Sequence, residues 1–260
     1  MENKKERIED FKTAIISTIK SLSNSQKIDV SFGSNSNSVT NSIKLPELQL
    51  VRDKINYEEI RAVADSKSLN YRFSDKKTLK KYEPKGNISK KLYFISEKIR
   101  CEKIGTSYFK GVKNNIEKFY QKRLSSLNLK SSEDKILESF ENYLRIKFLD
   151  FKNQDQTDKK LKTYKKELNH QFKDKIDELK NLALEQEKFN SLVSKLISNM
   201  SFDENIEEEE KREEENENEE KQSKPKDQEQ KSSKKDEQYE EMSIESGIPD
   251  LDNKAKESDI

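Results

Sequence analysis

The sequence predicts a mostly α-helical protein: a single helical domain over residues 1–202 with a short strand near residues 27–32, followed by a disordered acidic tail over residues 203–260. Apolar residues recur at spacings of three and four through the first part of the chain, as the buried face of a helix requires. Only 30% of the 260 residues are hydrophobic and 40% are charged, a composition that supports one modest core. From Asp203 onward apolar residues almost vanish, which predicts disorder.

The first helix is predicted by an apolar stripe near the start of the chain. Its members are Ile8, Phe11, Ile15, Ile19 and Leu22. The segment Lys27–Phe32 then alternates polar and apolar side chains, a pattern that is typical of a strand. Gly33 and a Ser/Asn-rich stretch follow, and their turn chemistry predicts a loop.

A second helix is predicted to begin near Asn56. The pair Asn56 and Glu59 resembles a helix start, and the apolar pattern continues through Ile60, Ala64 and Leu69. This helix should run to about Phe73.

Pro84 and Gly86 interrupt the pattern, and four more apolar stripes follow. The stripes are Ile88, Leu92, Ile95 and Ile99, ending near Gly105; Phe109, Val112, Ile116 and Phe119; Leu137, Phe140, Leu144 and Phe148; and Leu182, Phe189, Leu192 and Leu196. Each stripe predicts a helix, because spacings of three and four place its members on one face. A Lys-rich polar helix is expected between the last two stripes.

The net charge of +1 conceals two halves of opposite charge. Residues 1–200 hold 42 Lys and Arg against 28 Asp and Glu, whereas residues 201–260 hold 10 against 23. The body is therefore basic and the tail acidic. The densest acidic run, Glu207 to Glu220, is typical of a solvated tail or linker, and a contact with a basic partner is the other interpretation.

The sequence carries no recognisable catalytic, cofactor-binding or metal-binding motif. Its five glycines are too scattered for a phosphate-binding loop, so we expect no ATP hydrolysis by this chain. His170 is the single histidine and Cys101 the single cysteine, too few for a nucleophilic triad or a transition-metal cluster. We expect His170 to be an ordinary exposed residue of the polar helix.

The expected location is the cytoplasm. A single cysteine fits a reducing compartment. No apolar run approaches the roughly 20 residues of a membrane span, and the acidic start of the chain is not followed by the apolar stretch of an export signal.

A nucleic-acid-binding role is the alternative interpretation. Residues 71–130 hold 17 basic and 5 acidic side chains, an excess that would suit a phosphate backbone. However, Lys is abundant throughout the chain, and no known nucleic-acid-binding signature accompanies this charge. A basic helical nucleic-acid-binding protein with an acidic tail is therefore the rival rather than the favoured interpretation.

Several motifs follow one another in an order that resembles a known family. They are Val30–Gly33, Leu45-Pro46, Ala64-Asp65-Ser66, Leu69, Arg72, Pro84-x-Gly86, Ser96–Gly105 and Phe109–Ile116. Their order and spacing resemble the N-terminal region of the T subunit of aerobic cobaltochelatase, the CobT family. The counterparts of the family's E-x-x-R-x-E-x-x-G and Gly-Val runs are Glu97, Arg100, Glu102, Gly105, Gly111, Val112 and Asn115. The family's glutamate-rich linker has its counterpart from Glu207 onward.

Two features depart from the family pattern. Phe73 stands where a histidine commonly follows the Arg72 position. The family also ends in a von Willebrand-type domain whose D-x-S-x-S motif holds a divalent ion, and this sequence has no such motif, since Asp65-Ser66-Lys67-Ser68 has a different spacing. Relative to the family, the chain is expected to be truncated or one half of a split gene.

The resemblance implies a non-catalytic subunit of an ATP-dependent complex that inserts cobalt into a corrin ring during cobalamin biosynthesis. The implied partners are an AAA+ ATPase subunit, which would bind ATP and Mg, and a large tetrapyrrole-binding subunit, which would bind cobalt and the corrin. No cofactor is expected in this chain. Its own role would be to bind the ATPase.

The candidate partner-binding residues lie where the resemblance is densest, over residues 97–115. An apolar face that includes Ile99 and Val112 would pack two helices together, so the charged side chains between them are expected to face outward. Glu97 and Arg100 would either pair on the surface or contact the ATPase. The candidates are Glu97, Arg100, Glu102, Lys110, Lys113 and Asn115.

Overall fold

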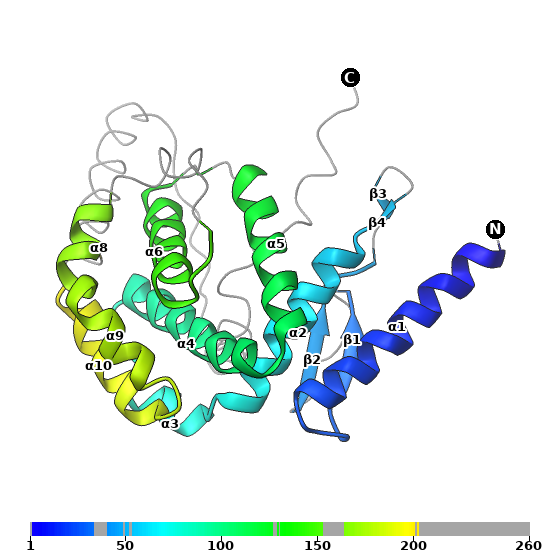
Figure 1. Cartoon of the computed structure of the whole chain (residues 1–260), viewed down its shortest axis with the longest axis horizontal. Helices are drawn as coiled ribbons and strands as arrows, with labels where there is room; N and C mark the ends of the chain where they lie inside the picture. The colour runs from blue at the N-terminus through cyan, green and yellow to red at the C-terminus, as the bar shows by residue number, and fades with distance from the viewer. Residues whose placement is uncertain are drawn as a thin grey trace, which may run out of the picture.

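The computed structural model describes residues 2–33, 41–48, 50–51, 54–126, 129, 131–152, 164–200 and 202. Helices dominate this part of the chain, so the predicted mostly α fold is confirmed. Figure 1 shows α1 and a small sheet at one side of the molecule, α2, α4 and α5 in the middle, and α8 to α10 at the other side. The predicted disordered tail over residues 203–260 lies outside the described residues.

The N-terminal part consists of one long helix and a small sheet. Helix α1 (Glu2–Leu22) precedes β1 (Asp29–Phe32), which pairs in parallel with β2 (Ser42–Leu45) so that Val30 lies opposite Ile43. The predicted strand is therefore confirmed. Strand β2 is not among the predicted elements.

A second, very short hairpin leads into the next helix. Strands β3 (Leu50–Val51) and β4 (Lys54–Ile55) are antiparallel and are followed directly by α2 (Tyr57–Phe73). The predicted helix start at Asn56 is confirmed. The Asn56 side chain makes no capping hydrogen bond, so apolar burial rather than a cap fixes this helix.

The main body is a set of helices joined by short connections. Its first members are α3 (Lys76–Lys81), α4 (Asn87–Tyr108), α5 (Lys110–Ser126) and α6 (Ser132–Phe148). After a stretch that the structure does not describe come α8 (Lys165–Phe172), the 3₁₀ turn η1 (Lys173–Lys175), α9 (Ile176–Asn181) and α10 (Gln186–Ser198). The predicted Lys-rich helix corresponds to α8, and His170 on it is exposed as expected.

Two hydrophobic clusters hold these elements together. The smaller one joins α1, β2 and α2 through residues such as Ile19, Leu45 and Ile60. The larger one runs from α3 to α10 and includes most of the predicted stripes. Helix α2 belongs to both, because Val63 packs in the small cluster and Leu69 in the large one. None of the described helices is long and apolar enough to cross a membrane.

Candidate functional site: a buried charge network beside a cavity

The three charged candidates on α4 are interior residues. Glu97, Arg100 and Glu102 are each only 1% exposed, so the expectation that they face outward is wrong. Spacing alone cannot distinguish a surface ion pair from a buried one, and here α2, α6 and the α9–α10 connection cover this side of α4 as well. Helix α4 is therefore buried around most of its circumference.

Arg100 joins three parts of the fold. Its guanidinium donates to both carboxylate oxygens of Glu97, with Nε–Oε2 and Nη2–Oε1 distances of 2.8 Å. Nη1 donates to the Ala183 carbonyl at 2.7 Å and Nη2 to the Phe73 carbonyl at 2.6 Å. Arg100 thereby ties α4 to the end of α2 and to the connection between α9 and α10. Glu97 compensates the buried positive charge of Arg100, and the two carbonyls accept hydrogen bonds from its N–H groups.

Glu102 belongs to a second buried network, which links α4 to α6. Arg145 on α6 donates to Glu102 at 2.7 Å and to Glu141 at 2.8 Å. Lys98 and Arg123 also donate to Glu141, each at 3.0 Å, and Arg123 pairs in addition with Glu138. Three cationic side chains thus converge on the Glu141 carboxylate.

The pKa of Glu141 reflects this convergence. Burial alone would raise the pKa, but the positive charges of Lys98, Arg145 and Arg123 outweigh it and hold the pKa well below the ordinary value for glutamate. Glu141 is therefore ionised at neutral pH. The network acts as a fixed arrangement of charges rather than as a proton donor.

The Ala64-Asp65-Ser66 motif on α2 contacts the same network. Ser66 donates to Glu102 at 2.6 Å. Asp65, which is fully buried, accepts from the Asn115 amide at 2.7 Å. Burial raises the pKa of Asp65, although its contacts with Asn115 and Arg61 oppose the increase. The motifs on α2, α4 and α5 that lie far apart in the sequence therefore meet in one interior region.

Gly105 permits the close approach of α2 to α4. A Cβ atom placed there would lie 2.2 Å from Cδ2 of Leu69, a fully buried residue. Gly111, in contrast, has no neighbour within 4 Å of such an atom. The α4–α5 junction falls between these two glycines, as expected, but only Gly105 is required by packing.

The remaining candidates lie on α5 and differ in orientation. Lys110 is exposed and Lys113 half-buried, whereas the half-buried Asn115 donates a hydrogen bond to Asp65.

Two further exposed lysines of α5 follow Lys110: Lys118 is eight residues further along the helix, and Lys122 is four residues after Lys118. These spacings put Lys110, Lys118 and Lys122 in one row, here called the α5 lysine row. None of the three has an ion pair in the part of the chain that the structure describes.

A cavity of about 180 Å³ lies beside the charge network. Its polar wall includes Ser66, Lys98, Glu102, Arg123, Glu141 and Arg145. Its apolar wall includes Ile43, Val63, Leu79, Ile116 and Phe119, which come from both hydrophobic clusters. This interhelical cavity therefore lies where the two clusters meet.

Sequence reasoning did not identify the part of this region that comes from α5 and α6. The side chains concerned are Tyr120, Arg123, Glu138, Glu141 and Arg145. One signal was available: Glu141 and Arg145 each follow a member of the apolar stripe, so at about 100° per residue they flank its buried face.

Cys101 contacts the Arg100–Glu97 pair, with its Sγ 3.6 Å from Nη2 of Arg100 and 3.8 Å from Oε1 of Glu97. Cys101 is fully buried, and burial raises the pKa of its thiol well above the ordinary value. Across the described ranges, no three His, Cys, Asp or Glu residues are arranged to hold a metal ion.

Comparison with protein-family models matches residues 5–259 to the family described as cobalamin biosynthesis protein CobT. No curated protein and no solved structure matches the chain. The match covers all the motifs that meet around the charge network.

Proposed function

Because the chain belongs to the CobT family of cobalamin biosynthesis proteins, we propose that it is a non-catalytic subunit of an ATP-dependent cobaltochelatase-like complex that inserts cobalt into a corrin ring. Its task in this proposal is to bind the AAA+ ATPase partner. The ATPase binds ATP and Mg, and the large tetrapyrrole-binding subunit binds cobalt and the corrin. The complex works in the cytoplasm.

The α5 lysine row is the observation that supports this proposal most directly. Helix α5 is held from inside by the Asn115–Asp65 hydrogen bond and by the ion pair of Arg123 with Glu138. Its outer face carries Lys110, Lys118 and Lys122. A rigid helix with a row of cations is suited to bind a complementary acidic surface, because no conformational entropy of the backbone is lost on binding.

The buried charged residues of α4 support a structural role, in contrast to the exposed lysines of α5. Glu97, Arg100 and Glu102 form hydrogen bonds with backbone and side-chain groups of the same chain. They position α2, α4, α6 and the α9–α10 connection relative to one another. In this proposal they shape the binding surface rather than form it.

A pull-down with purified components tests the proposal. The full chain is immobilised, and the AAA+ ATPase subunit of the same complex is applied with ATP and Mg at about 0.15 M salt, where charges further apart than about 8 Å are screened. We expect retention of the ATPase, and no retention of an unrelated AAA+ protein of similar net charge. Absence of retention both with and without nucleotide would exclude the proposed task.

A parallel binding experiment with nucleic acid separates the proposed ATPase-binding role from the alternative role in nucleic-acid binding. A basic nucleic-acid-binding protein would bind a generic RNA or DNA duplex with an affinity that falls steeply as salt rises. We expect such binding to be lost at physiological salt while the ATPase is still retained. The opposite pattern would favour the nucleic-acid-binding function.

A further inference from the structure

The exposed face of α5 carries lysines and no acidic side chain. The exposed residues of this helix, as far as the structure describes it, are Lys110, Gly111, Asn114, Lys118, Lys122 and Ser125. The single acidic residue of α5, Glu117, is half-buried and accepts hydrogen bonds from the Lys152 amide and the Gln121 side chain. The α5 lysine row therefore presents three positive charges that no carboxylate on the same face balances.

Other helices of comparable length expose both signs of charge. Helix α2 exposes Glu58 and Arg72, and α6 exposes Asp134 and Lys147. The three ammonium groups of the α5 lysine row, in contrast, have neither a hydrogen bond nor an ion pair among the described residues. They are therefore available to an anionic group that approaches from the solvent.

A matching negative charge is present in the same chain. The segment Glu207–Glu220, here called the acidic run, holds ten glutamates against Lys211 and Arg212, a net charge of −8. It lies outside the described residues, and its charge follows from the sequence alone. The run thus has more than enough carboxylates to pair with the three lysines of the row.

The described part of the chain ends near α5. Phe202 packs against Tyr164, the residue before α8, with ring centroids 5.7 Å apart. Helix α8 packs on α6 through Phe172 and Phe140, and α6 is joined to α5 by the ion pairs of Arg123. Figure 1 shows the helices in the order α8, α6, α5. Because packed helix axes lie about 8–10 Å apart, only about 20 Å separate the axes of α8 and α5.

The chain after Phe202 is long enough to cover this distance. An extended chain spans about 3.3–3.6 Å per residue, so the eleven residues from Phe202 to Glu213, in the middle of the acidic run, reach about 36–40 Å. From Lys110 to Lys122 the row extends about 18 Å along the helix axis. Five or six extended residues cover that length. The acidic run can therefore lie along the whole α5 lysine row.

We propose that the acidic run binds the α5 lysine row of the same chain and competes there with the ATPase. The contact itself involves only residues of this chain, whereas the competition rests on the proposed ATPase-binding function. An acidic surface of the ATPase and the acidic run need the same three ammonium groups, so they exclude each other. Release of the run is then required for full affinity.

Zero-length cross-linking of the full chain tests the contact without the ATPase. A carbodiimide joins an ammonium group to a carboxylate in direct contact, and mass spectrometry identifies the joined residues. We expect the α5 lysine row to link to the acidic run at least about threefold more often than Lys166 does at about 0.05 M salt, and the excess to vanish at about 1 M, where the screening length is about 3 Å.

Lys166 is a stringent control for this experiment. It is exposed and follows two residues after Tyr164, against which Phe202 packs, so it lies beside the start of the tail. A tail without a preferred site would link to Lys166 at least as often as to the α5 lysine row. That result would overturn the proposed contact.

A mixture of isotope-labelled and unlabelled chains separates contact within a chain from contact between two copies. Links within a chain join fragments that carry the same label, and their yield per chain does not change on dilution. We expect this pattern. Links mainly between labelled and unlabelled fragments would show that the acidic run binds a second copy, and would overturn binding within the chain.

Two full-length variants with equal charge changes test the competition, each with six glutamates of the tail replaced by glutamine. The first variant changes the acidic run and is Glu207→Gln, Glu208→Gln, Glu209→Gln, Glu210→Gln, Glu213→Gln, Glu214→Gln. The control changes later positions and is Glu229→Gln, Glu237→Gln, Glu240→Gln, Glu241→Gln, Glu245→Gln, Glu257→Gln. Both sets lie outside the described helices, and circular dichroism checks that the helical content is retained.

The variants should differ in their affinity for the AAA+ ATPase. We expect the acidic-run variant to bind about three- to tenfold more tightly than the original chain, because a competitor in the same chain lowers the fraction of molecules whose lysine row is open. The control should bind as the original chain does. Equal affinity of the two variants would overturn the competition.

The two experiments fail separately. If none of the three proteins binds the ATPase, the proposed function and the competition both fail, while the cross-links decide the contact by themselves. If the ATPase binds but the cross-links show no preference for the α5 lysine row, the contact is overturned and the ATPase-binding function stands.

Discussion

Arg100 on α4 donates a hydrogen bond from Nη2 to the carbonyl oxygen of Phe73, the last residue of α2, at 2.6 Å. The carbonyl group at a helix end has no partner within its own helix. Arg100 supplies one and at the same time neutralises Glu97. The end of α2, the middle of α4 and the α9–α10 connection are therefore held by one side chain.

Charge reversal at Arg100 should unfold the domain or nearly so. Arg100→Glu places a second carboxylate beside Glu97 and leaves the Ala183 and Phe73 carbonyls unpaired, so we expect the free energy of unfolding to fall by about 3–5 kcal/mol or more. Lys110→Glu reverses an exposed charge near the same motif and should change it by no more than about 0.5 kcal/mol. Urea denaturation followed by circular dichroism measures both. Similar stability of the two variants would contradict the structural role of Arg100.

Gly105 should not tolerate a methyl group. Gly105→Ala would drive Leu69 out of its place, and we expect a loss of about 1–3 kcal/mol although alanine is the better helix former. Gly111→Ala, at an exposed position with free space, should leave stability unchanged or slightly higher. A double-mutant cycle with Leu69→Ala completes the test, because truncation of Leu69 should cost less in the Gly105→Ala background. Additive losses would mean that the two residues do not constrain each other.

Acid should weaken the fold through Glu141. The pKa of Glu141 is lower in the folded protein than in the unfolded chain, so its contribution to stability is fully present above the unfolded value and is lost as the pH falls toward the folded value. The relevant window lies below the ordinary glutamate pKa of 4.5. Asp65 acts in the opposite direction, because its pKa is raised and protonation relieves the cost of burying its charge.

Unfolding titrations between pH 7 and pH 3 measure this effect. Glu141→Gln should be less stable at pH 7 by about 3 kcal/mol, since three buried or partly buried cations lose their shared partner. It should also lose less stability than the original chain as the pH falls. Glu178→Gln, in an exposed pair with Lys175, is the control and should follow the original curve. Parallel curves for all three proteins would show that Glu141 is not the source of acid sensitivity.

The helices could be predicted from sequence because each buries a periodic apolar face. Leu92 and Ile99 of α4 and Phe140 of α6 are all in the core as expected. Strand β2 was not predicted, because its alternation of polar and apolar residues spans only four positions and its hydrogen bonds come from β1, across a polar stretch.

The charge network could not be predicted for a related reason. The two backbone carbonyls that accept from Arg100 lie 27 and 83 residues away in the sequence, and Glu102 pairs with Arg145 at a separation of 43. A charged residue on an apolar helix is read as exposed unless its distant partner is known. The orientation of Glu97, Arg100 and Glu102 depends on these long-range contacts.

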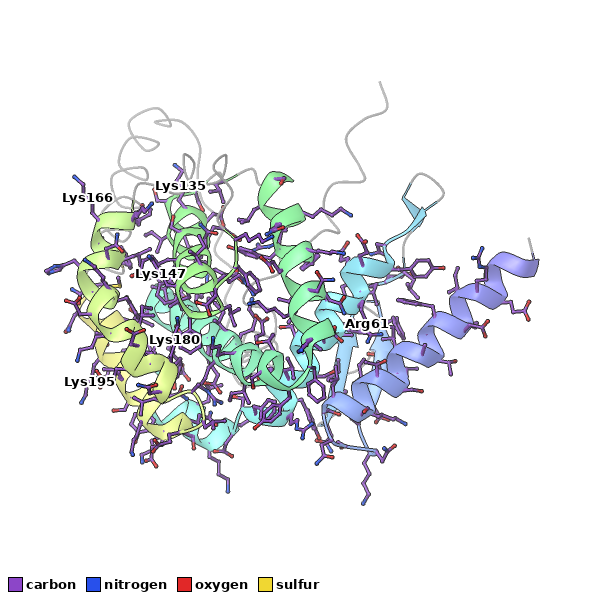
Figure 2. All side chains as sticks on the ribbon, in the orientation of Figure 1. Arg61, Lys135, Lys147, Lys166, Lys180 and Lys195 are labelled. Atoms are coloured by element: carbon purple, nitrogen blue, oxygen red, sulfur yellow. The ribbon has the colours of Figure 1, made fainter. Side chains whose placement is uncertain are left out.

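The α5 lysine row is the surface on which the proposed task depends, and a second set of lysines provides its control. Lys147 on α6, Lys166 on α8 and Lys195 on α10 are also exposed, and Figure 2 shows them on the side of the body occupied by α6, α8 and α10. Three charge reversals in either set change the net charge by the same amount. Only the position of the charges differs.

The dissociation constant for the AAA+ ATPase subunit, measured for the full chain and for the two triple variants, is the most direct test. The α5 variant is Lys110→Glu, Lys118→Glu, Lys122→Glu, and the control is Lys147→Glu, Lys166→Glu, Lys195→Glu. With circular dichroism unchanged in both, the α5 variant should bind at least about tenfold more weakly, a loss of about 1.4 kcal/mol, and the control should bind nearly as the original chain. Equal affinity of the two variants for the ATPase would contradict the assignment of the α5 lysine row as the partner-binding surface.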